Sequence, residues 1–380
     1  VYFLHYAGYW AGDDTVLAFS HLHLEGTGAT DYGVLGVMPV VAFDGTRTTD
    51  AGHASKMDKA SEHAEAGYYA VHLTREDIQA EFTASAHTAV HRYRFPATTA
   101  QGTVVFDLDH HLPGGSVSDA DVTLDPAAGT IRGRLHSIGG MSGRFGGYDV
   151  FFAARASEPW TAQVWTHARP MPAPGAEAHG TGVGVGLAFD VSDHAPVELQ
   201  VAVSLVDAQG ADAILAAEPP LPAFDSTRGA ARDAWNGRLR AVRVVAGGSD
   251  DDRRAFYSAL YRTLLMPSVT SDPDGRFRFG AQVGTATGYA FVNDLSLWDT
   301  YRTTNPLYAL LWPDRARDIV RSLDQMAQIG GFFPKWPLAT GESGVMLGSS
   351  AEIVVADAYL RGVRDFDAES VFERLRPAAM

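Results

Sequence analysis

The segment Pro219-Pro220-Leu221-Pro222 divides the sequence into two halves that differ in hydrophobic periodicity. On its N-terminal side, short runs rich in β-branched and aromatic residues are separated by Gly, Pro and Asp turns, and several alternate apolar and polar positions. A period of two is typical of strands. After Ser226, apolar residues recur at spacings of three and four, which is typical of helices. The sequence therefore predicts a β domain followed by an α domain.

The N-terminal half predicts an antiparallel β-sandwich over residues 1–225. Asp125-Pro126-Ala127-Ala128-Gly129 has the composition of a hairpin turn, since Pro presets one backbone dihedral and Gly supplies a positive one. Roughly a dozen strands without intervening helices favour antiparallel sheets, because parallel strands need crossover connections. We also expect one or two strands of the sandwich to precede Val1. The clearest expected strands are residues 68–73, 78–83, 90–95, 104–108, 148–153, 162–166 and 197–206.

The C-terminal half predicts helices that form the first part of a larger α domain. Ser249-Asp250-Asp251-Asp252 is a capping signature with acidic residues in the first turn. Pro313 suits the first turn of another helix, which Gly330-Gly331 ends. We assign residues 226–248 to a linker helix and residues 249–380 to the N-terminal part of the α domain. The expected apolar stripes are Phe256, Leu260 and Leu264; Ile319, Leu323 and Met326; and Ile353, Val354, Tyr359 and Leu360, with a last helix starting at Asp367.

The composition is that of an ordinary globular protein with an acidic surface. Of the 380 residues, 46% are hydrophobic and 20% are charged, and the formal net charge is −15. Only three of the thirty basic residues are lysines, and no run of basic residues occurs. Nucleic acid and anionic membranes are therefore poor partners, and a neutral polyol such as a sugar fits this surface better, although a solvated acidic face is the simpler interpretation. The absence of cysteine excludes disulfides, thiolate metal sites and cysteine nucleophiles.

Two segments carry weaker patterns. His21, His23 and Glu25 lie on one face if the chain is extended there, and two imidazoles with a carboxylate are potential metal ligands. Because no further well-placed ligand accompanies them, we favour polar residues that line an interdomain cleft. The glycine-rich residues 180–186 do not lie between a strand and a helix, as a dinucleotide-binding loop requires, and we interpret them as a Gly-rich strand or loop.

The stretch from residue 294 to residue 350 is the richest in binding chemistry. Trp298, Asp299 and Arg302 place an aromatic face beside a carboxylate and a guanidinium, and Trp336 adds an aromatic ring in a non-helical segment. A pyranose stacks its C–H faces on Trp and hydrogen-bonds its hydroxyls to Asp and Arg, so these residues predict a sugar site. The alternative is a Trp–Asp pair buried in the helical core. Glu342, which follows a glycine in a loop, is a candidate catalytic carboxylate.

These segments, in their order along the chain, resemble the α-mannosidases of glycoside hydrolase family 92. The resemblance implies a β-sandwich packed on an (α/α)6 barrel, and a calcium-dependent, exo-acting enzyme that hydrolyses α-mannosides with inversion. It extends over almost the whole chain and is carried by residues 20–28, 65–69, 91–96, 256–267 and 298–302, by Pro334-Lys335-Trp336-Pro337-Leu338-Ala339, and by Ala356-Asp357-Ala358-Tyr359-Leu360.

The resemblance also implies residue roles. Glu342 falls on the glutamate of the family's Gly-Asn-Glu motif and is implied to be the general acid. Trp298 and Asp299 fall on the pair that lines the terminal-mannose subsite, which Gly26, Thr27 and Gly28 of a sandwich loop also reach. Thr340-Gly341 replaces the family's Gly-Asn before the acid, a departure that bears on leaving-group preference.

The family's catalytic base and calcium ligands are expected beyond Met380, so no metal site is expected within residues 1–380. The rest of the same polypeptide is then expected to complete the barrel. An acid without its base would leave these residues inactive on their own, because inverting hydrolysis needs both.

Three functions follow as hypotheses. The first is a secreted or periplasmic inverting α-mannosidase whose partner is a mannose-containing glycan. The second is a hydrolase of the same family that uncaps mannose-1-phospho-6-mannose, a phosphodiester whose phosphate leaves without help from an acid; the retained Glu342 argues against it. The third is a non-catalytic carbohydrate-binding protein, in which Trp298 and Asp299 bind the sugar and nothing cleaves it.

Overall fold

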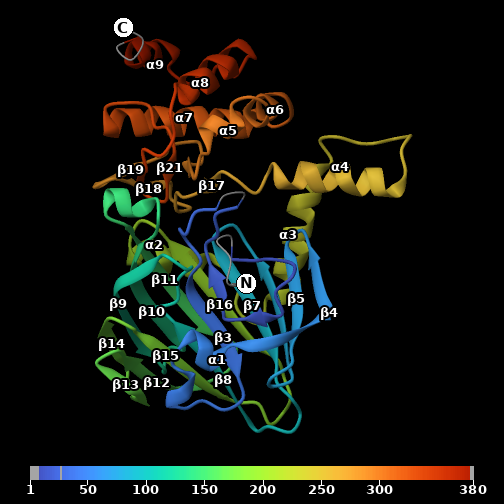
Figure 1. Ribbon diagram of the computed structural model, residues 1–380, viewed down its shortest axis with the longest axis vertical. Helices are drawn as coiled ribbons and strands as arrows, with labels where there is room; N and C mark the ends of the chain where they lie inside the picture. The colour runs from blue at the N-terminus through green and yellow to red at the C-terminus, as the bar shows by residue number, and fades with distance from the viewer. Residues whose placement is uncertain (1–7, 26–27, 377–380) are drawn as a thin grey trace. The chain divides into compact units, whose positions relative to one another are not determined.

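The computed structural model describes residues 8–25 and 28–376, which form two compact units (Figure 1). The first unit contains the residues up to Gly140 together with Asp149–Arg238. The second contains Met141–Tyr148, a loop that interrupts the β half of the sequence, together with the residues from Leu239 onward. Among the described helices, none combines the length and the apolar composition needed to cross a lipid bilayer.

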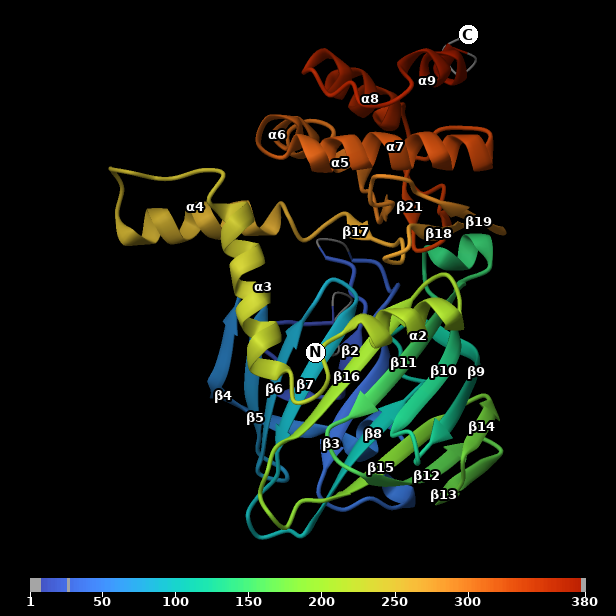
Figure 2. The same cartoon turned by 180° about the vertical axis from the view of Figure 1, so that it is seen from behind.

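Two antiparallel sheets build the first unit, as predicted (Figure 2). In the described residues, the larger sheet has the order β1 (Thr15–Val16), β4 (Ser55–Glu65), β5 (Tyr68–Leu73), β6 (Ile78–Ala84), β7 (Thr88–Arg94), β16 (Val197–Ser204), β11 (Tyr148–Ala156), β10 (Thr130–Ile138), β9 (Ser116–Asp125) and β14 (Glu177–Gly180). The smaller sheet has the order β13 (Arg169–Pro174), β12 (Trp160–Thr166), β15 (Gly184–Asp190), β8 (Gln101–Asp107), β3 (Val34–Val40) and β2 (Phe19–His21).

The core of the first unit lies between the two sheets. Phe106 of β8 stacks on Phe152 of β11, with ring centroids 6.4 Å apart, so the two sheets pack face to face. Both rings are buried. The expected hairpin is present: Thr130 pairs with Asp125 across the β9–β10 turn, where Gly129 has a φ of 66°. Burial of one face of each sheet supplies the main driving force for this sandwich.

A helix that the sequence did not predict follows the last strand of the sandwich. Helix α2 (Ala208–Ala217) follows β16, and its apolar side chains Ala211, Ile214 and Leu215 are buried together with Ala153 and Ala202 of the larger sheet. These positions have the i, i+3, i+4 spacing of one helix face. Helix α2 has ten residues and begins two positions after the expected strand 197–206. The periodicity of so short a segment did not distinguish it from the end of that strand. The expectation of strands without intervening helices is wrong between β3 and β4, where two short helices lie, η1 (Gly45–Arg47) and α1 (Asp50–His53).

The second unit is helical, with short two-stranded sheets that the sequence did not reveal. The Ser249 side chain accepts from Asp252 N–H, and the Asp252 carboxylate accepts from Ser249 N–H, which completes the predicted capping box. Helix α3 (Phe224–Leu239) precedes this unit. The described helices and strands of the second unit from Leu239 onward are α4 (Asp250–Arg262), β17 (Ser268–Val269), β18 (Arg276–Phe279), β19 (Gln282–Thr285), β20 (Val292–Asn293), α5 (Leu297–Thr300), α6 (Thr304–Leu311), α7 (Pro313–Gly330), β21 (Pro337–Leu338), β22 (Gly341–Glu342), α8 (Ser350–Leu360) and α9 (Ala368–Leu375).

Helix α7 matches its prediction closely, whereas α8 does not. Pro313 occupies the first turn of α7, and Gly331 ends it with a φ of 78°. In α8, by contrast, three of the four residues predicted to be buried, Ile353, Tyr359 and Leu360, are exposed, and the buried face contains Val354 together with Ala351, Val355 and Ala358. The side chains of α8 itself are small or apolar on nearly every face of the helix, so their spacing alone could not identify the buried face. Phe256 of α4 is likewise exposed.

Candidate active site

Hydrogen bonds hold the segment that precedes Trp298 beside the segment that carries Glu342. The Asn293 side-chain amide donates to the Ala339 carbonyl at 2.7 Å, and Ala339 N–H donates to the Asp294 carboxylate at 2.9 Å. Leu295 N–H donates to the Pro337 carbonyl at 3.1 Å. Asn293 and Asp294 are both buried. Two segments about forty residues apart are therefore fixed as neighbours by buried polar groups, which are costly to separate.

The Trp298–Asp299 pair lies in the single turn of α5. Trp298 is 44% exposed, and Asp299 is exposed as well. The Ser296 hydroxyl donates to Asp299 Oδ2 at 2.5 Å, which orients the carboxylate. The alternative of a Trp–Asp pair buried in the helical core is therefore wrong.

Arg302 lies against Trp298. Its guanidinium carbon is 4.2 Å from the centre of a Trp298 ring and 4.5 Å from the Tyr301 ring, and its Nη1 donates to the Trp298 carbonyl. A cation over an aromatic face is attracted to the electron-rich ring. Arg302 thus covers one part of Trp298 and orients it, while much of the indole stays accessible.

Glu342 is held by backbone donors at the end of a tight hairpin. It lies in β22, which pairs with β21, and is partly buried. Its carboxylate accepts from Lys335 N–H at 2.9 Å, from Trp336 N–H at 3.3 Å and from Gly344 N–H at 2.6 Å. Trp336 is only 3% exposed, and it contributes its backbone N–H to the site. That its ring contacts substrate stays a prediction. Three backbone donors fix the position of the Glu342 carboxyl group.

A hollow of about 340 Å3 lies beside Glu342 in the second unit. The ideal Cβ position of Gly341 is 2.7 Å from the Phe145 ring, so a larger residue does not fit there without movement. Phe145 belongs to η2 (Ser142–Phe145) in the loop inserted between β10 and β11, which the sequence did not associate with the helices. The described residues that line the hollow are Phe145, Gly147, Phe279, Gly280, Ala281, Gln282, Ile329, Gly330, Thr340, Gly341 and Glu342. Trp298 and Asp299 are not among them, so the predicted single cleft stays a prediction.

The loop of the first unit that was expected to reach the sugar is described only in part. Gly26 and Thr27 lie outside the described residues, and Gly28 lies within them. His21 Nδ1 lies 2.8 Å from the Leu35 carbonyl, and burial lowers the pKa of His21 to about 4. His23 Nε2 lies 3.0 Å from the Ser20 carbonyl, and burial lowers its pKa to about 3. Both imidazoles are bonded to backbone carbonyls, and our preference against a metal site at these residues stays a prediction.

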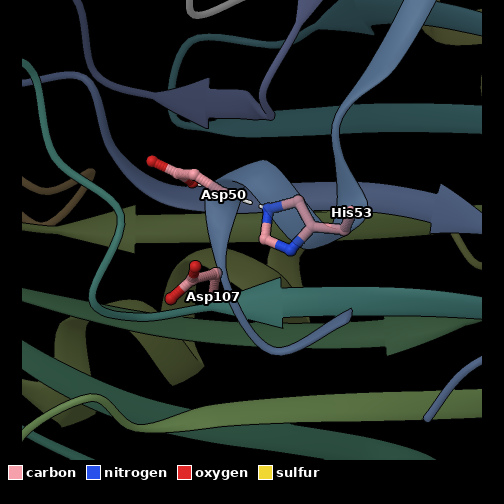
Figure 3. Close-up of side chains that lie close together, drawn as sticks. All are labelled: Asp50, His53 and Asp107. Atoms are coloured by element: carbon pink, nitrogen blue, oxygen red, sulfur yellow. Dashed lines mark ion pairs between the residues drawn. The ribbon is translucent and has the colours of Figure 1, made fainter. Parts of the chain in front are cut away.

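Potential metal ligands gather elsewhere. Within the described residues, the sole group of three or more His, Asp or Glu side chains with converging ligand atoms is Asp50, His53 and Asp107, in the first unit (Figure 3). The sequence did not reveal it, because Asp107 is more than fifty positions from the other two. The spacing of Asp50 and His53 on one helix turn was the available signal.

The order of an antiparallel sandwich followed by helices is shared with solved glycoside hydrolases. Residues 3–204 match the glycosyl hydrolase family 92 N-terminal domain, and residues 210–380 match the glycosyl hydrolase family 92 catalytic domain. The chain therefore belongs to glycosyl hydrolase family 92.

Solved structures and a curated relative agree with this assignment. The family GH92 α-mannosidase BT3965 from Bacteroides thetaiotaomicron is 25% identical, with a TM-score of 0.90 over 100% of this chain and 52% of its own. It has also been solved in complex with mannoimidazole, with the same TM-score of 0.90 over 99% of this chain and 50% of its own. An uncharacterized secreted glycosidase of Arthroderma benhamiae is 25% identical over 95% of this chain and 45% of its own length. The chain thus spans about half the length of the relatives it matches.

Proposed function

We propose that the complete polypeptide is a calcium-dependent, exo-acting α-mannosidase that hydrolyses terminal α-linked mannose from glycans with inversion. The observation that carries the proposal is the exposed Trp298–Asp299 pair on a segment hydrogen-bonded beside the anchored Glu342. The α-mannosidase neighbours, one of them bound to mannoimidazole, support mannose as the sugar. The similarity to a secreted glycosidase supports a secreted or periplasmic location.

Trp298, Asp299 and Arg302 would bind the terminal sugar. The exposed part of the Trp298 indole offers an apolar surface to the C–H face of a pyranose. Asp299 can accept hydrogen bonds from sugar hydroxyls while Ser296 holds its orientation. Arg302 keeps the indole in place and carries further donors. Gly26, Thr27 and Gly28 are proposed to complete this subsite.

Glu342 would act as the general acid. Its proton passes to the glycosidic oxygen as the bond from that oxygen to the anomeric carbon breaks, so the leaving sugar departs as a neutral alcohol. A water attacks the opposite face of the anomeric carbon and gives its proton to a base, with acid and base roughly 6.5–9.5 Å apart in inverting enzymes. The N–H groups of Lys335, Trp336 and Gly344 are in place to bind the carboxylate that remains.

The base and the calcium ligands are proposed to lie in the part of the polypeptide that follows Met380. Calcium takes six to eight oxygen ligands, and the described residues of the second unit include no group of three converging Asp, Glu or His side chains. These residues therefore do not fit a calcium site by themselves. We assign none of them a role in holding the ion.

The arrangement next to Glu342 leaves one alternative substrate open to test. Thr340-Gly341 departs from the family motif, and a mannosyl phosphodiester would need no protonated leaving group. A sugar-hydroxyl leaving group needs the proton of a positioned carboxyl group such as Glu342, which a phosphodiesterase would not use. A non-catalytic carbohydrate-binding protein would bind mannose and release none.

The experiment is hydrolysis of an α-linked mannobioside by the complete protein, followed by proton NMR of the first product. Inversion gives β-mannose before mutarotation, and Asp299→Asn, which keeps the size of the side chain but removes its charge, should reduce the initial rate. Release of α-mannose first, or mannose binding without hydrolysis in the presence of calcium, would contradict the proposal. Preference for mannose-1-phospho-6-mannose over the mannobioside would select the alternative.

A further inference from the structure

Three buried or partly buried side chains of the first unit point their ligand atoms toward one another (Figure 3). Asp50 and His53 are the first and last residues of α1, and Asp107 is the last residue of β8. One ligand atom from each of the three lies within 4.8 Å of the others. His53 is 1% exposed and Asp107 is 5% exposed, so bulk water does not solvate these groups fully.

The hydrogen bonding of His53 leaves its inward nitrogen available. Nδ1 lies 3.1 Å from the Arg47 carbonyl, which can only accept, so Nδ1 carries a proton. In the neutral ring, Nε2 then has a free lone pair. Nε2 is buried, lies 3.5 Å from Asp50 Oδ1 and has no hydrogen-bond partner within the described part of the chain. When the ring is neutral, this buried nitrogen beside the Asp50 carboxylate is available to a ligand.

The outer contacts of this group are those of a supported metal site. His110 Nδ1 lies 2.7 Å from Asp50 Oδ1, and Asp109 N–H donates to Asp107 Oδ1 at 2.9 Å. Metal-ligating carboxylates are commonly oriented by such neighbours, and a ligating His usually donates its other N–H to a carbonyl, as His53 does to Arg47.

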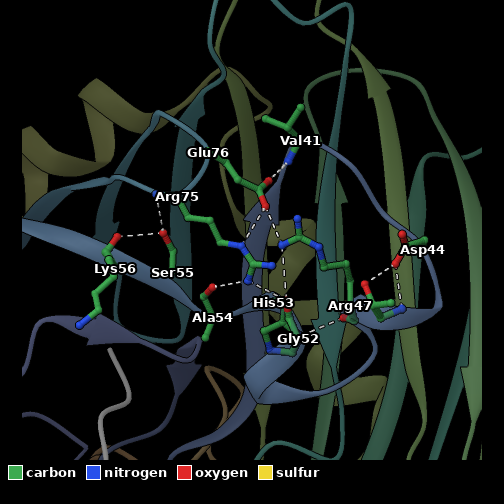
Figure 4. A network of polar contacts seen from close by, with 11 residues as sticks. Val41, Asp44, Arg47, Gly52, His53, Ala54, Ser55, Lys56, Arg75 and Glu76 are labelled. Carbon is green, nitrogen blue, oxygen red and sulfur yellow. Dashed lines mark hydrogen bonds and ion pairs between the residues drawn. The ribbon is translucent and has the colours of Figure 1, made fainter.

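A network of arginines and a glutamate holds the loop that carries two of the three ligands (Figure 4). Glu76 accepts from Val41 N–H and forms an ion pair with Arg47 at 2.6 Å. Arg75 Nη1 donates to the carbonyls of Gly52, at 2.9 Å, and Ala54, at 2.8 Å. These bonds hold the backbone on either side of His53. A site carried by a backbone held in this way is positioned before its ligand arrives.

We propose that Asp50, His53 and Asp107 bind a divalent first-row transition ion, with zinc as the best fit, which ties α1 to the end of β8. Two carboxylates and a neutral imidazole carry a charge of −2, which a divalent ion neutralises. An imidazole donor and three protein ligands favour zinc over calcium. The ligand atoms around a tetrahedral ion with bonds of about 2.1 Å lie about 3.4 Å apart, so side chains whose ligand atoms lie within 4.8 Å of one another must draw closer when the ion binds.

This zinc site is independent of the proposed hydrolase function, because it uses no residue of the candidate active site. The probe is zinc chloride, added to the metal-stripped complete protein in the presence of excess calcium, so that calcium sites are filled. The wild-type protein should bind one more zinc per chain than His53→Gln, by elemental analysis after dialysis. Zinc should raise the Tm of the wild type and leave that of His53→Gln unchanged, since an ion that binds only the folded state stabilises it.

His72→Gln is the matched control. His72 also pairs with one carboxylate, Asp77 at 2.8 Å, but it does not belong to the three-ligand group. The His72→Gln variant should therefore bind as much zinc as the wild type. Asp107→Asn, nearly equal in size to the native residue, provides a second variant if His53→Gln does not fold. Cobalt in the wild type should give visible absorption bands that zinc displaces. Equal zinc in the wild type and the folded variants, or a wild type without a zinc-dependent Tm and without cobalt bands, would overturn the proposal and leave a protonated His53 bridging two aspartates.

Discussion

Glu342 and Asp107 are both fixed carboxylates, but their partners differ. Glu342 accepts from three backbone N–H groups, is partly exposed and borders a hollow in the helical unit. Asp107 is buried in the sandwich unit, accepts one backbone N–H and faces an imidazole and a second carboxylate. Backbone donors hold a carboxyl group in place while a substrate can still reach it. Burial among other titratable groups excludes a large substrate and favours a cation. This difference is why we propose chemistry on a glycan at Glu342 and the binding of an ion at Asp107.

Replacing Glu342 by Gln tests the first half of this comparison and has the largest expected effect. Gln keeps the size of the side chain but cannot give up a proton, so turnover of an α-mannobioside should fall by about 10²–10⁴-fold. An activated aryl mannoside should lose much less, because its leaving group needs no proton. The measurement is kcat of the complete enzyme on both substrates at saturating calcium. An equal loss on both would mean that Glu342 orders the site and donates no proton.

Acid should destabilise the sandwich unit through its buried histidines. Burial lowers the pKa of His21 from 6.5 to about 4, so between these values the unfolded chain binds more protons than the folded one. The free energy of unfolding should therefore be unaffected by His21 above pH 6.5 and should fall as the pH drops toward 4, by on the order of 3 kcal/mol. Urea denaturation across this pH range measures the effect, and a His21→Gln variant should have a shallower dependence. An unchanged slope in that variant would refute the assignment to His21.

Asp299→Ala should weaken substrate binding and turnover together. Hydrogen bonds to a charged carboxylate are worth about 1.5–3 kcal/mol, so kcat/KM on a mannobioside should fall about 10–100-fold. Asp299 is exposed, and the Tm should change little. Unchanged kinetics with a lowered Tm would assign Asp299 to the stability of α5.

Gly341→Ala has the smallest expected effect and tests how tightly the inserted loop packs beside Glu342. The added methyl group would lie 2.7 Å from the Phe145 ring, and overpacking of this kind costs about 1–3 kcal/mol, so the Tm should fall. Gly330→Ala is the control, because nothing lies within 4 Å of its added methyl group and alanine favours a helix. Equal Tm values for the two variants would show that the loop carrying Phe145 moves to accommodate the added methyl group at little cost.

Periodicity and end signals along the sequence were sufficient for elements whose cause is local. Strand β5 occupies residues 68–73 as predicted, and α7 begins at Pro313 and ends before Gly331, because side-chain alternation, a proline in the first turn and a glycine with positive φ act within a few residues. The exposed Trp298 was one of two alternatives that its neighbours in sequence left open, and Glu342 lies in the short strand β22 where a loop was expected. The buried face of α8 could not be inferred, because apolar residues occur on nearly every face of that helix.

The tertiary structure alone decided the contacts that join distant residues. Phe145 comes to the hollow beside Glu342 from a loop nearly two hundred positions earlier, and the Asp294–Ala339 bond joins segments with no shared pattern. Asp107 meets Asp50 and His53 only because β8 ends where the short helix α1 lies. Local patterns record which backbone conformation a segment prefers. Which side chains converge depends on how sheets and helices bury their apolar faces against one another, and the free energy of that burial belongs to pairs of elements rather than to any one stretch of sequence.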